Sequence, residues 1–308
     1  MSGELFYLKP PTLVFNDLFY SFDTAEFAII GVPFDGTTSF RPGSRFAPLE
    51  IRRISRELES YSVEDGVDYD SIRVCDLGDL EVSQTPEDTV SRLEKAIAEV
   101  VSRRKVPIVL GGEHTVSIGS VSALRGALGE LAVLLFDAHA DMRDEYPVGA
   151  KLSHATVARR IGEIVGYEKM AIVGLRALGA EEHEFLEEKD VKYVTSGDLR
   201  RGRGLSEILE HLKSQGDRVY LSVDLDVFDP SYAPGVSNPE PLGIDPFDFL
   251  EVVNGVAERG FEIAGFDVVE ASPPYDLGGI TSALAARIVK LLVCKAYKLS
   301  KRKGRQSS

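Results

Sequence analysis

The sequence predicts an α/β protein in which helices cover both faces of a mostly parallel central sheet of about eight strands. Three observations lead to this fold class. Short apolar runs alternate with segments of helical periodicity. Several of the helical segments begin with recognisable N-cap residues. Polar side chains that can bind ligands follow the apolar runs, at the edge where parallel sheets usually carry their sites.

The apolar runs have the length and composition of buried strands. They lie at residues 27–32, 71–75, 106–110, 132–136, 170–173, 191–194, 219–223 and 262–266. Helices fit between most of them. Thr85-Pro86 is typical of an N-cap followed by proline at the first helical position, and Asp245-Pro246 repeats the pattern. We therefore expect a three-layer α/β/α arrangement.

Composition limits the classes of function. The 308 residues contain no linker, repeat or low-complexity segment, so we expect one domain over 1–308, with a basic tail that is disordered from about residue 300. A net charge of −14 disfavours nucleic acid and anionic membranes as partners and favours a cation. Only two cysteines are present, and the first eleven residues lack a signal-peptide layout, so we expect a cytoplasmic protein.

Six metal-ligand side chains follow three of the predicted strands. Burying carboxylates and imidazoles is costly unless a cation compensates them. Because the carboxyl ends of parallel strands share one edge, we expect the three groups to meet in space. The candidate ligands are His114 after the strand at 106–110, Asp137, His139 and Asp141 after the strand at 132–136, and Asp224 and Asp226 after the strand at 219–223.

The number and chemistry of these ligands favour two cations. A fully extended segment from Asp137 to Asp141 would span about 13 Å, so the chain must curl for its ligands to share a site. Two ions roughly 3.5–4 Å apart fit six ligands better than one ion does. Four aspartates match the charge of two divalent cations, and the oxygen-rich set favours Mn²⁺ over Zn²⁺. We therefore expect two Mn²⁺ per chain.

The same segments resemble the signature motifs of a known family. Gly112-Glu113-His114, Phe136-Asp137-Ala138-His139-Ala140-Asp141 and Ser222-Val223-Asp224-Leu225-Asp226 are similar to those of the ureohydrolases, which include arginases and agmatinases. The resemblance extends from residues 31–43 to residues 269–273 and the last long helix. It implies an arginase/deacetylase-like fold, a pair of Mn²⁺ ions held by the six ligands, and hydrolysis of a guanidinium group to urea and an amine.

The resemblance also assigns roles to individual residues. Asp226 would bridge the metals and orient the attacking hydroxide. His154 matches the proton-transfer histidine, since only histidine titrates naturally near neutral pH. Glu270 matches the carboxylate that grips the guanidinium by paired hydrogen bonds. Glu113 is expected to orient a ligand from outside the site. The family also implies a homo-oligomer, a trimer or hexamer.

Substrate preference depends on two loops. Arginases place aspartates just after a Gly-x-Arg segment, where this chain has Ala177 and Gly179, and they carry an Asn and hydroxyl residues where it has residues 142–146. The segments present instead resemble those of agmatinases, which implies agmatine, a small dication, as substrate. The remaining possibilities are guanidinobutyrate or arginine, with Arg143 or Lys151 binding a substrate carboxylate.

Two further functions stay open. A catalytically idle binding protein of the same fold is disfavoured because all the expected ligands, His154 and Glu270 are intact. A two-metal phosphoesterase is the least favoured, because no basic phosphate clamp accompanies the ligands.

Overall fold

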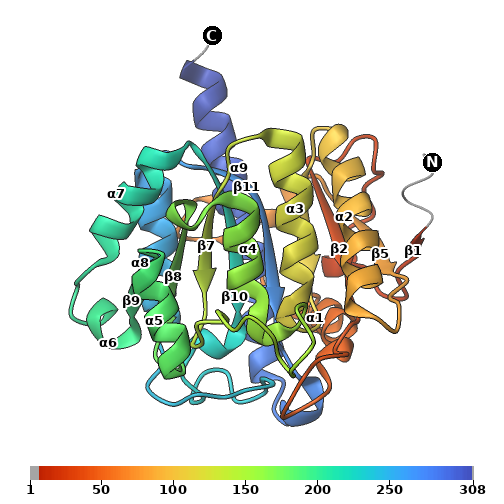
Figure 1. Cartoon of the computed structure of the whole chain (residues 1–308). Coiled ribbons are helices and arrows are strands. Elements are labelled where there is room, and N and C mark those ends of the chain that lie inside the picture. The colour runs from red at the N-terminus through yellow and green to blue at the C-terminus, as the bar shows by residue number, and fades with distance from the viewer. Residues whose placement is uncertain (1–6, 307–308) are drawn as a thin grey trace.

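A nine-stranded, mostly parallel sheet forms the centre of the computed structural model, which describes residues 7–306, with side chains to residue 302 (Figure 1). The strand order is β1-β5-β2-β6-β11-β10-β7-β8-β9, and β1 alone pairs antiparallel with its neighbour. The strands are β1 Leu8–Lys9, β2 Phe27–Gly31, β5 Val74–Leu80, β6 Val106–Leu110, β7 Ala132–Phe136, β8 Met170–Leu175, β9 Lys192–Thr195, β10 Arg218–Asp224 and β11 Glu262–Val269.

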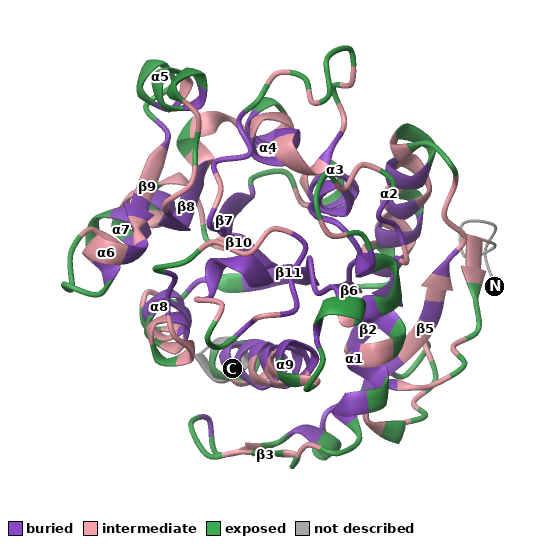
Figure 2. Cartoon of the chain, turned by 90° about the horizontal axis from the view of Figure 1, so that it is seen from below, coloured by how far each residue is buried: buried purple, intermediate pink, exposed green. Residues whose placement is uncertain are grey.

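Helices cover both faces of this sheet, so the three-layer arrangement is confirmed (Figure 2). One apolar core joins the sheet to α1, α7, α8 and α9, and a second joins it to α2, α3, α4 and α5. The helices are α1 Ala47–Ser55, α2 Pro86–Ser102, α3 Ser117–Leu128, α4 Val157–Val165, α5 Ala180–Glu188, α6 Ser196–Leu199, α7 Leu205–Gln215, α8 Pro246–Glu258 and α9 Ile280–Gln306.

Strand β7 shows why the strands of such a sheet read as continuous apolar runs. Its five residues are all buried, and they alternate between the two cores. Leu134 and Phe136 pack toward α8, whereas Val133 and Leu135 pack on the opposite face. Because both faces are covered, neither set of positions tolerates a polar residue. The first polar side chains therefore come where the strand ends.

Eight of the nine strands were expected, with ends that differ by a few residues. The largest shift concerns β5, which was expected at 71–75 but runs from Val74 to Leu80. Its carboxyl half contains Asp76 and Asp79, which mask the strand pattern. The short edge strand β1 was missed, as was a separate two-stranded sheet formed by β3 Tyr61–Ser62 and β4 Val67–Asp68. Two residues are too few to give a period.

The expected helix starts are confirmed. The Thr85 side chain accepts a hydrogen bond from the Asp88 amide, and Asp245 accepts from the amides of Phe247 and Asp248. The helical segment at the end of the chain is longer than expected, because α9 continues to Gln306 and only residues 307–308 of the expected disordered tail lie outside the described residues. Lys298 and Lys301 attach this end of α9 to Asp65 and Glu26.

No helix in residues 7–306 is both long and apolar enough to cross a membrane.

The strands that precede the candidate ligands lie side by side. Strand β10 pairs with β7 on one side and with β11 on the other, and β11 pairs with β6. All four are parallel, so their carboxyl ends meet at one edge in the middle of the sheet. This explains why segments more than 100 residues apart in the chain form one site.

A buried ion pair attaches α1 to the sheet. Arg52 is 1 % exposed, and its guanidinium donates to Asp76 at 2.7 Å and to Asp79 at 2.5 Å. It also donates to the Gly78 carbonyl at 3.0 Å. All the partners belong to β5, so a single side chain fixes the position of α1 against that strand. Removing one member of a buried pair leaves the other charge uncompensated.

We therefore expect Arg52→Ala to lower the free energy of unfolding by about 3–5 kcal/mol. Urea denaturation followed by circular dichroism measures this loss. Arg53→Ala is the matched control, because the neighbouring Arg53 pairs with Glu50 on the exposed face of α1. Its unfolding midpoint should stay close to that of the wild type. Equal midpoints for the two variants would contradict the role of Arg52.

Candidate metal centre and active site

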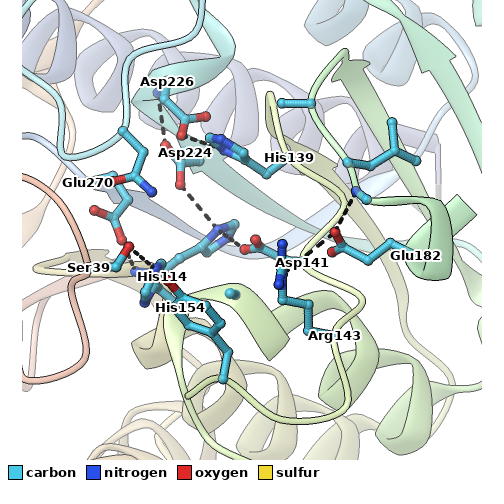
Figure 3. A pocket seen from close by; sticks show the side chains of 16 residues that line it. Ser39, His114, His139, Asp141, Arg143, His154, Glu182, Asp224, Asp226 and Glu270 are labelled. Atoms are coloured by element: carbon cyan, nitrogen blue, oxygen red, sulfur yellow. Dashed lines mark hydrogen bonds and ion pairs between the residues drawn. The ribbon is translucent and has the colours of Figure 1, made fainter. Parts of the chain in front are cut away.

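The six expected ligands converge at the carboxyl edge of the central strands. Figure 3 labels five of them, all except Asp137. His114 begins a single 3₁₀ turn, His114–Val116, shortly after β6. Asp137, His139 and Asp141 lie on the segment that leaves β7, and Asp224 ends β10. Asp226 lies in the turn that follows, Leu225–Val227. The structure thus brings together all six residues, although sequence separations between them reach 112 positions, from His114 to Asp226.

The ligand atoms form two adjacent groups. His114, Asp137 and Asp224 make one group, and Asp137, His139 and Asp226 make the other. His114 Nδ1 lies 3.1 Å from Asp137 Oδ2 and 3.3 Å from Asp224 Oδ2, and Asp141 Oδ2 is also 3.3 Å away. His139 Nδ1 lies 2.9 Å from Asp226 Oδ2. Two sites that share one carboxylate fit a pair of cations better than a single ion.

The shared carboxylate belongs to Asp137. The family resemblance gave the bridging role to Asp226, but Asp226 occurs in only one of the two groups. Asp226 has a second contact, because its Oδ1 accepts the Ala138 amide at 3.1 Å. This bond connects the end of β10 to the segment after β7. Asp137 is therefore the residue that the two groups share, and the bridging role of Asp226 stays an expectation.

The expected curl of the 137–141 segment is present. Asp141 has a φ of 50°, in the left-handed region that non-glycine residues rarely adopt. This conformation turns the Asp141 carboxylate back toward His114. Backbone strain of this kind persists where the surrounding structure requires it, often at functional sites. A residue at the metal centre is therefore held in a costly conformation.

A chain of hydrogen bonds determines which nitrogen of His114 is free. The Ser222 hydroxyl donates to Asp267 Oδ1 at 2.7 Å, so its oxygen is left as an acceptor for His114 Nε2 at 3.0 Å. Tyr220 donates to the other oxygen of Asp267 at 2.6 Å, which keeps that carboxylate in place. Nε2 therefore carries a hydrogen, so Nδ1 is the nitrogen that faces the carboxylates. Burial alone would lower the pKa of His114, but the contacts with Asp137, Asp141 and Asp224 outweigh it and the pKa is raised.

Either a proton on Nδ1 or a bound cation would compensate the carboxylates that face this nitrogen. His114 Nδ1 is buried, and among the described residues it contacts only the carboxylate oxygens of Asp137, Asp141 and Asp224. These groups fit a metal ion. They offer one imidazole nitrogen and several carboxylate oxygens, and Ser222 orients the imidazole through its other nitrogen. With His139 included, the set is rich in oxygen and suits Mn²⁺. The residues present therefore fit the expected pair of ions.

The pKa values at the centre reflect the same excess of negative charge. Burial, then the charge of Asp137, raises the pKa of Asp141 to about 7. Burial also raises the pKa of Asp224. Burial alone would lower the pKa of His139, but Asp226 and Asp137 outweigh it and the pKa is raised. Protons and metal ions compete for these groups, so bound cations would hold the carboxylates ionised.

A cavity of about 330 Å³ opens beside the ligands, and Glu270 lines it. Glu270 follows β11 and has a φ of 66°, which makes it the second residue of the site in a left-handed conformation. Its Oε1 accepts the His114 amide at 2.7 Å. Its Oε2 is buried and makes no well-aligned hydrogen bond in the described structure. Burial raises the pKa of the carboxyl to about 8, although the nearby Ser237 hydroxyl acts to lower it. A cationic ligand would satisfy this oxygen.

A second unpartnered oxygen belongs to Asn238, on the loop after β10. Its Oδ1 is buried and lacks a hydrogen-bond partner among residues 7–302, and the residue lines the same cavity. Arg176 holds this loop in place: its guanidinium donates to the carbonyls of Asp226 and Glu240, each at 2.7 Å. The cavity therefore offers two fixed acceptors to a ligand that carries several N–H donors.

His154 lies at the same cavity, in the 3₁₀ turn His154–Thr156. Its Nδ1 is 3.2 Å from Thr37 Oγ1, and its Nε2 is 3.2 Å from Ser39 Oγ. Burial, then the positive charge of His139 and His114, lowers the pKa of His154 to about 4. The imidazole is therefore neutral at pH 7 and able to accept a proton.

Arg143 lines the outer part of the cavity with residues that sequence reasoning missed. Its guanidinium lies 5.2 Å from the centre of the Tyr146 ring, and Nε is 3.7 Å from Glu182 Oε2. Glu182 is buried in the first turn of α5 and accepts the amides of Met142 at 3.1 Å and Gly179 at 2.9 Å. Its spacing of three from Gly179 signals a helix start in the sequence, but not a place in the site.

Comparison with known proteins agrees with the site. The Arginase family model matches residues 25–294. The N(1)-aminopropylagmatine ureohydrolase of Thermococcus kodakarensis is 36% identical over 270 residues, with 87% of this chain and 89% of that protein covered. The agmatinase of Pyrococcus horikoshii is 36% identical over 267 residues, with 86% and 90% covered. The crystal structure of agmatine ureohydrolase of Thermoplasma volcanium superposes with a TM-score of 0.84 at 36% identity, covering 92% and 93% of the two chains.

The Ser222 bond predicts a measurable effect on metal affinity. Ser222→Ala removes the acceptor that keeps the hydrogen of His114 on Nε2, so we expect Mn²⁺ to bind about 10- to 100-fold more weakly. Electron paramagnetic resonance of free Mn²⁺ during titration measures the affinity. Ser214→Ala is the control. Its hydroxyl lies at the surface, donates to the carbonyl of His211 and accepts from the side-chain amide of Gln215. Unchanged affinity in Ser222→Ala would contradict the orienting role.

Proposed function

Because the chain belongs to the arginase family, we propose that it hydrolyses agmatine to putrescine and urea, with two Mn²⁺ per chain. It is a ureohydrolase of the arginase and agmatinase kind, which act on guanidino compounds. Agmatine as the substrate and manganese as the metal are the parts that are proposed. The observation that carries the proposal is the pair of unpartnered oxygens, Glu270 Oε2 and Asn238 Oδ1, beside the ligand cluster.

The six ligands would hold the metals: His114, Asp137, His139, Asp141, Asp224 and Asp226. When bound, a pair of divalent cations supplies a nucleophile at neutral pH by lowering the pKa of water. The remaining steps belong to the side chains around the cavity. They must bind the guanidinium, exclude competing orientations and move protons.

Glu270 is the residue that would bind the guanidinium. Its Oε1 is fixed by the His114 amide, so the free Oε2 has a defined direction relative to the ligand cluster. A guanidinium carries five N–H donors in a planar fork, and a carboxylate is its best acceptor. Asn238 Oδ1 provides a further acceptor. This pair would place the guanidinium carbon beside the cluster, where effective concentration contributes to the rate.

His154 would transfer a proton to the leaving amine. Hydrolysis of a guanidinium by water gives urea and an alkylammonium, so both protons of the water end on the amine nitrogen. Neutral His154 takes up one of these protons and returns it to that nitrogen as the C–N bond breaks. Its lowered pKa leaves it neutral before the reaction, which suits this order of events.

The far end of the cavity supports an amine as the other end of the substrate. Ala177 and Gly179, where arginases have aspartates, line it without a charge. Glu182 supplies a buried carboxylate on the same wall. This residue favours the terminal ammonium of agmatine over the carboxylate of arginine or guanidinobutyrate. Arg143 instead favours a substrate with a carboxylate, because its positive charge beside Glu182 would attract one.

The relatives give a second candidate substrate. Two of them share 36% identity with this chain, yet one is named for agmatine and the other for N(1)-aminopropylagmatine. The second compound has the same guanidinium with a longer polyamine chain, so it would use the same inner contacts. Its recognition would differ only at the outer cavity near Arg143 and Tyr146. A homo-oligomer in the cytoplasm remains our expectation for the assembled enzyme.

Urea release by Mn²⁺-loaded protein tests the function directly. Agmatine, N(1)-aminopropylagmatine, guanidinobutyrate and arginine should be assayed in parallel, and we expect agmatine to give the highest kcat/KM. The Asp226→Asn variant should lose activity by at least about 1,000-fold, because a ligand is changed without a change of shape.

The outcomes separate the alternatives. A higher kcat/KM for another of the four compounds would keep the chemistry and replace agmatine as the substrate. Absence of urea from every compound, with two Mn²⁺ bound per chain, would favour the binding-protein alternative. Retained activity in metal-free Asp226→Asn protein would contradict the proposed chemistry.

Arg143 predicts a change of preference. Arg143→Ala removes a positive charge from the outer cavity, so the ratio of kcat/KM for agmatine to that for guanidinobutyrate should rise about 5-fold, the effect of roughly 1 kcal/mol. Arg143→Lys keeps the charge and should leave the ratio near that of the wild type. A ratio that falls in Arg143→Ala would contradict the expected attraction between Arg143 and a substrate carboxylate.

A further inference from the structure

His154 is held from behind by a buried cluster that is separate from the metal ligands. Thr37, on the loop after β2, contacts His154 twice: Oγ1 accepts the His154 backbone amide at 3.0 Å and lies 3.2 Å from Nδ1. Thr37 is itself bound to Glu113, which is fully buried next to His114. The loop carrying Thr37 is attached to the segment after β6, because the Glu113 amide donates to the Phe34 carbonyl at 2.7 Å.

Glu113 is surrounded by donors. It accepts the Thr37 amide at 2.7 Å, the Thr37 hydroxyl at 2.5 Å and the Thr115 hydroxyl at 2.6 Å, with Thr38 Oγ1 at 3.3 Å. The Thr37 amide can only donate, and the short contacts of the Thr37 and Thr115 hydroxyls with one carboxylate oxygen fit donation to an ionised carboxylate. Burial raises the pKa of this carboxyl above its ordinary value, and the bonds from Thr115 and Thr37 offset part of that rise. The Thr37 and Thr115 hydroxyls thus each donate their single hydrogen to Glu113.

The hydrogen count at Thr37 then fixes the tautomer of His154. The single hydroxyl hydrogen of Thr37 points to Glu113, so Oγ1 can only accept from His154. The Nδ1 atom must carry a hydrogen to complete the 3.2 Å contact. Thr115 cannot change this result, because its own hydroxyl also donates to Glu113. Neutral His154 therefore has its hydrogen on Nδ1 and its lone pair on Nε2.

We propose that Glu113 and Thr37 position His154 for catalysis by holding a hydrogen on Nδ1, so that proton exchange with the substrate takes place at Nε2. This inference rests on the proposed function for its catalytic meaning. The neutral and the charged ring both keep Nδ1–H, so one proton is gained or lost at Nε2 without a ring flip. Ser39, the exposed residue 3.2 Å from Nε2, donates to it in the neutral state and accepts from it in the charged state.

The proposal accounts for every proton of the step. One proton of the attacking water moves to Nε2, and the imidazole becomes a cation stabilised through Thr37 by the Glu113 carboxylate. As the C–N bond breaks, its electron pair stays on the leaving nitrogen, and Nε2 returns its proton to that nitrogen. The second proton of the water leaves the oxygen that becomes the urea carbonyl and moves to the same nitrogen, which gives the alkylammonium. His154 ends neutral, again with its hydrogen on Nδ1. A ring with the opposite tautomer would present an N–H to the water and could not begin this sequence.

The test compares three substitutions on one loop. Thr37→Val keeps the shape of the side chain but removes the hydroxyl, Thr37→Ser keeps the hydroxyl, and Thr38→Val removes a hydroxyl that contacts Glu113 but not His154. The tautomer is read from ¹⁵N chemical shifts of histidine-labelled, Mg²⁺-loaded protein, since Mg²⁺ is diamagnetic. The chain has five histidines, and His154→Asn identifies the signal. Urea release from agmatine by the Mn²⁺-loaded variants gives kcat and KM.

We expect the Nδ1–H tautomer in the wild type, Thr37→Ser and Thr38→Val, and a shift toward Nε2–H in Thr37→Val. The kcat of Thr37→Val should fall about 10- to 100-fold with little change in KM, and Thr37→Ser should recover most of it. An Nε2–H tautomer in the wild type, or an unchanged tautomer in Thr37→Val, would overturn the proposal. The spectrum can be recorded without turnover. Absence of activity on agmatine would therefore contradict the proposed function, while the spectrum would still show whether Thr37 determines the tautomer of His154.

Discussion

The structure depends on the cost of collecting four carboxylates and two imidazoles at an edge where water is scarce. Asp137, Asp224 and Asp226 are each no more than 3 % exposed, and apolar cores lie on both faces of the sheet behind them. Such a cluster is unfavourable without positive charge. The left-handed backbone at Asp141 and the hydrogen bonds from His114 through Ser222 to Asp267 hold these groups together, and bound cations would offset the repulsion between them.

Much of this arrangement could be predicted from the sequence because strands covered on both faces leave a strong signal. The runs that became β6, β7 and β10 were placed almost to the residue, and the polar positions after them followed directly. Chain length then required the 137–141 segment to curl, and the φ of Asp141 shows where. Patterns of this kind are local, so they can be recognised in the sequence without knowledge of tertiary contacts.

The parts that the sequence did not predict depend on contacts between distant segments. Glu182 appears in the sequence as an ordinary helix-start acid, and nothing local shows that α5 brings it to the cavity. Thr37 and His154 are 117 residues apart, so their bond cannot be read from spacing. Strand β5 was misplaced because Asp76 and Asp79 neutralise Arg52, a residue of another element. Polar residues that are satisfied by tertiary partners look like loop residues until the partner is known.

The sharing of Asp137 between two ligand groups has a thermodynamic consequence. Two equilibria that use one carboxylate are linked, so occupancy of either group changes the affinity of the other by the same factor. Repulsion between the ions acts against joint occupancy, while the first ion orders the common ligand for the second. The balance sets how much half-loaded protein exists when metal is scarce. If both groups bind ions, the response of activity to metal supply would depend on how strongly Asp137 couples the two.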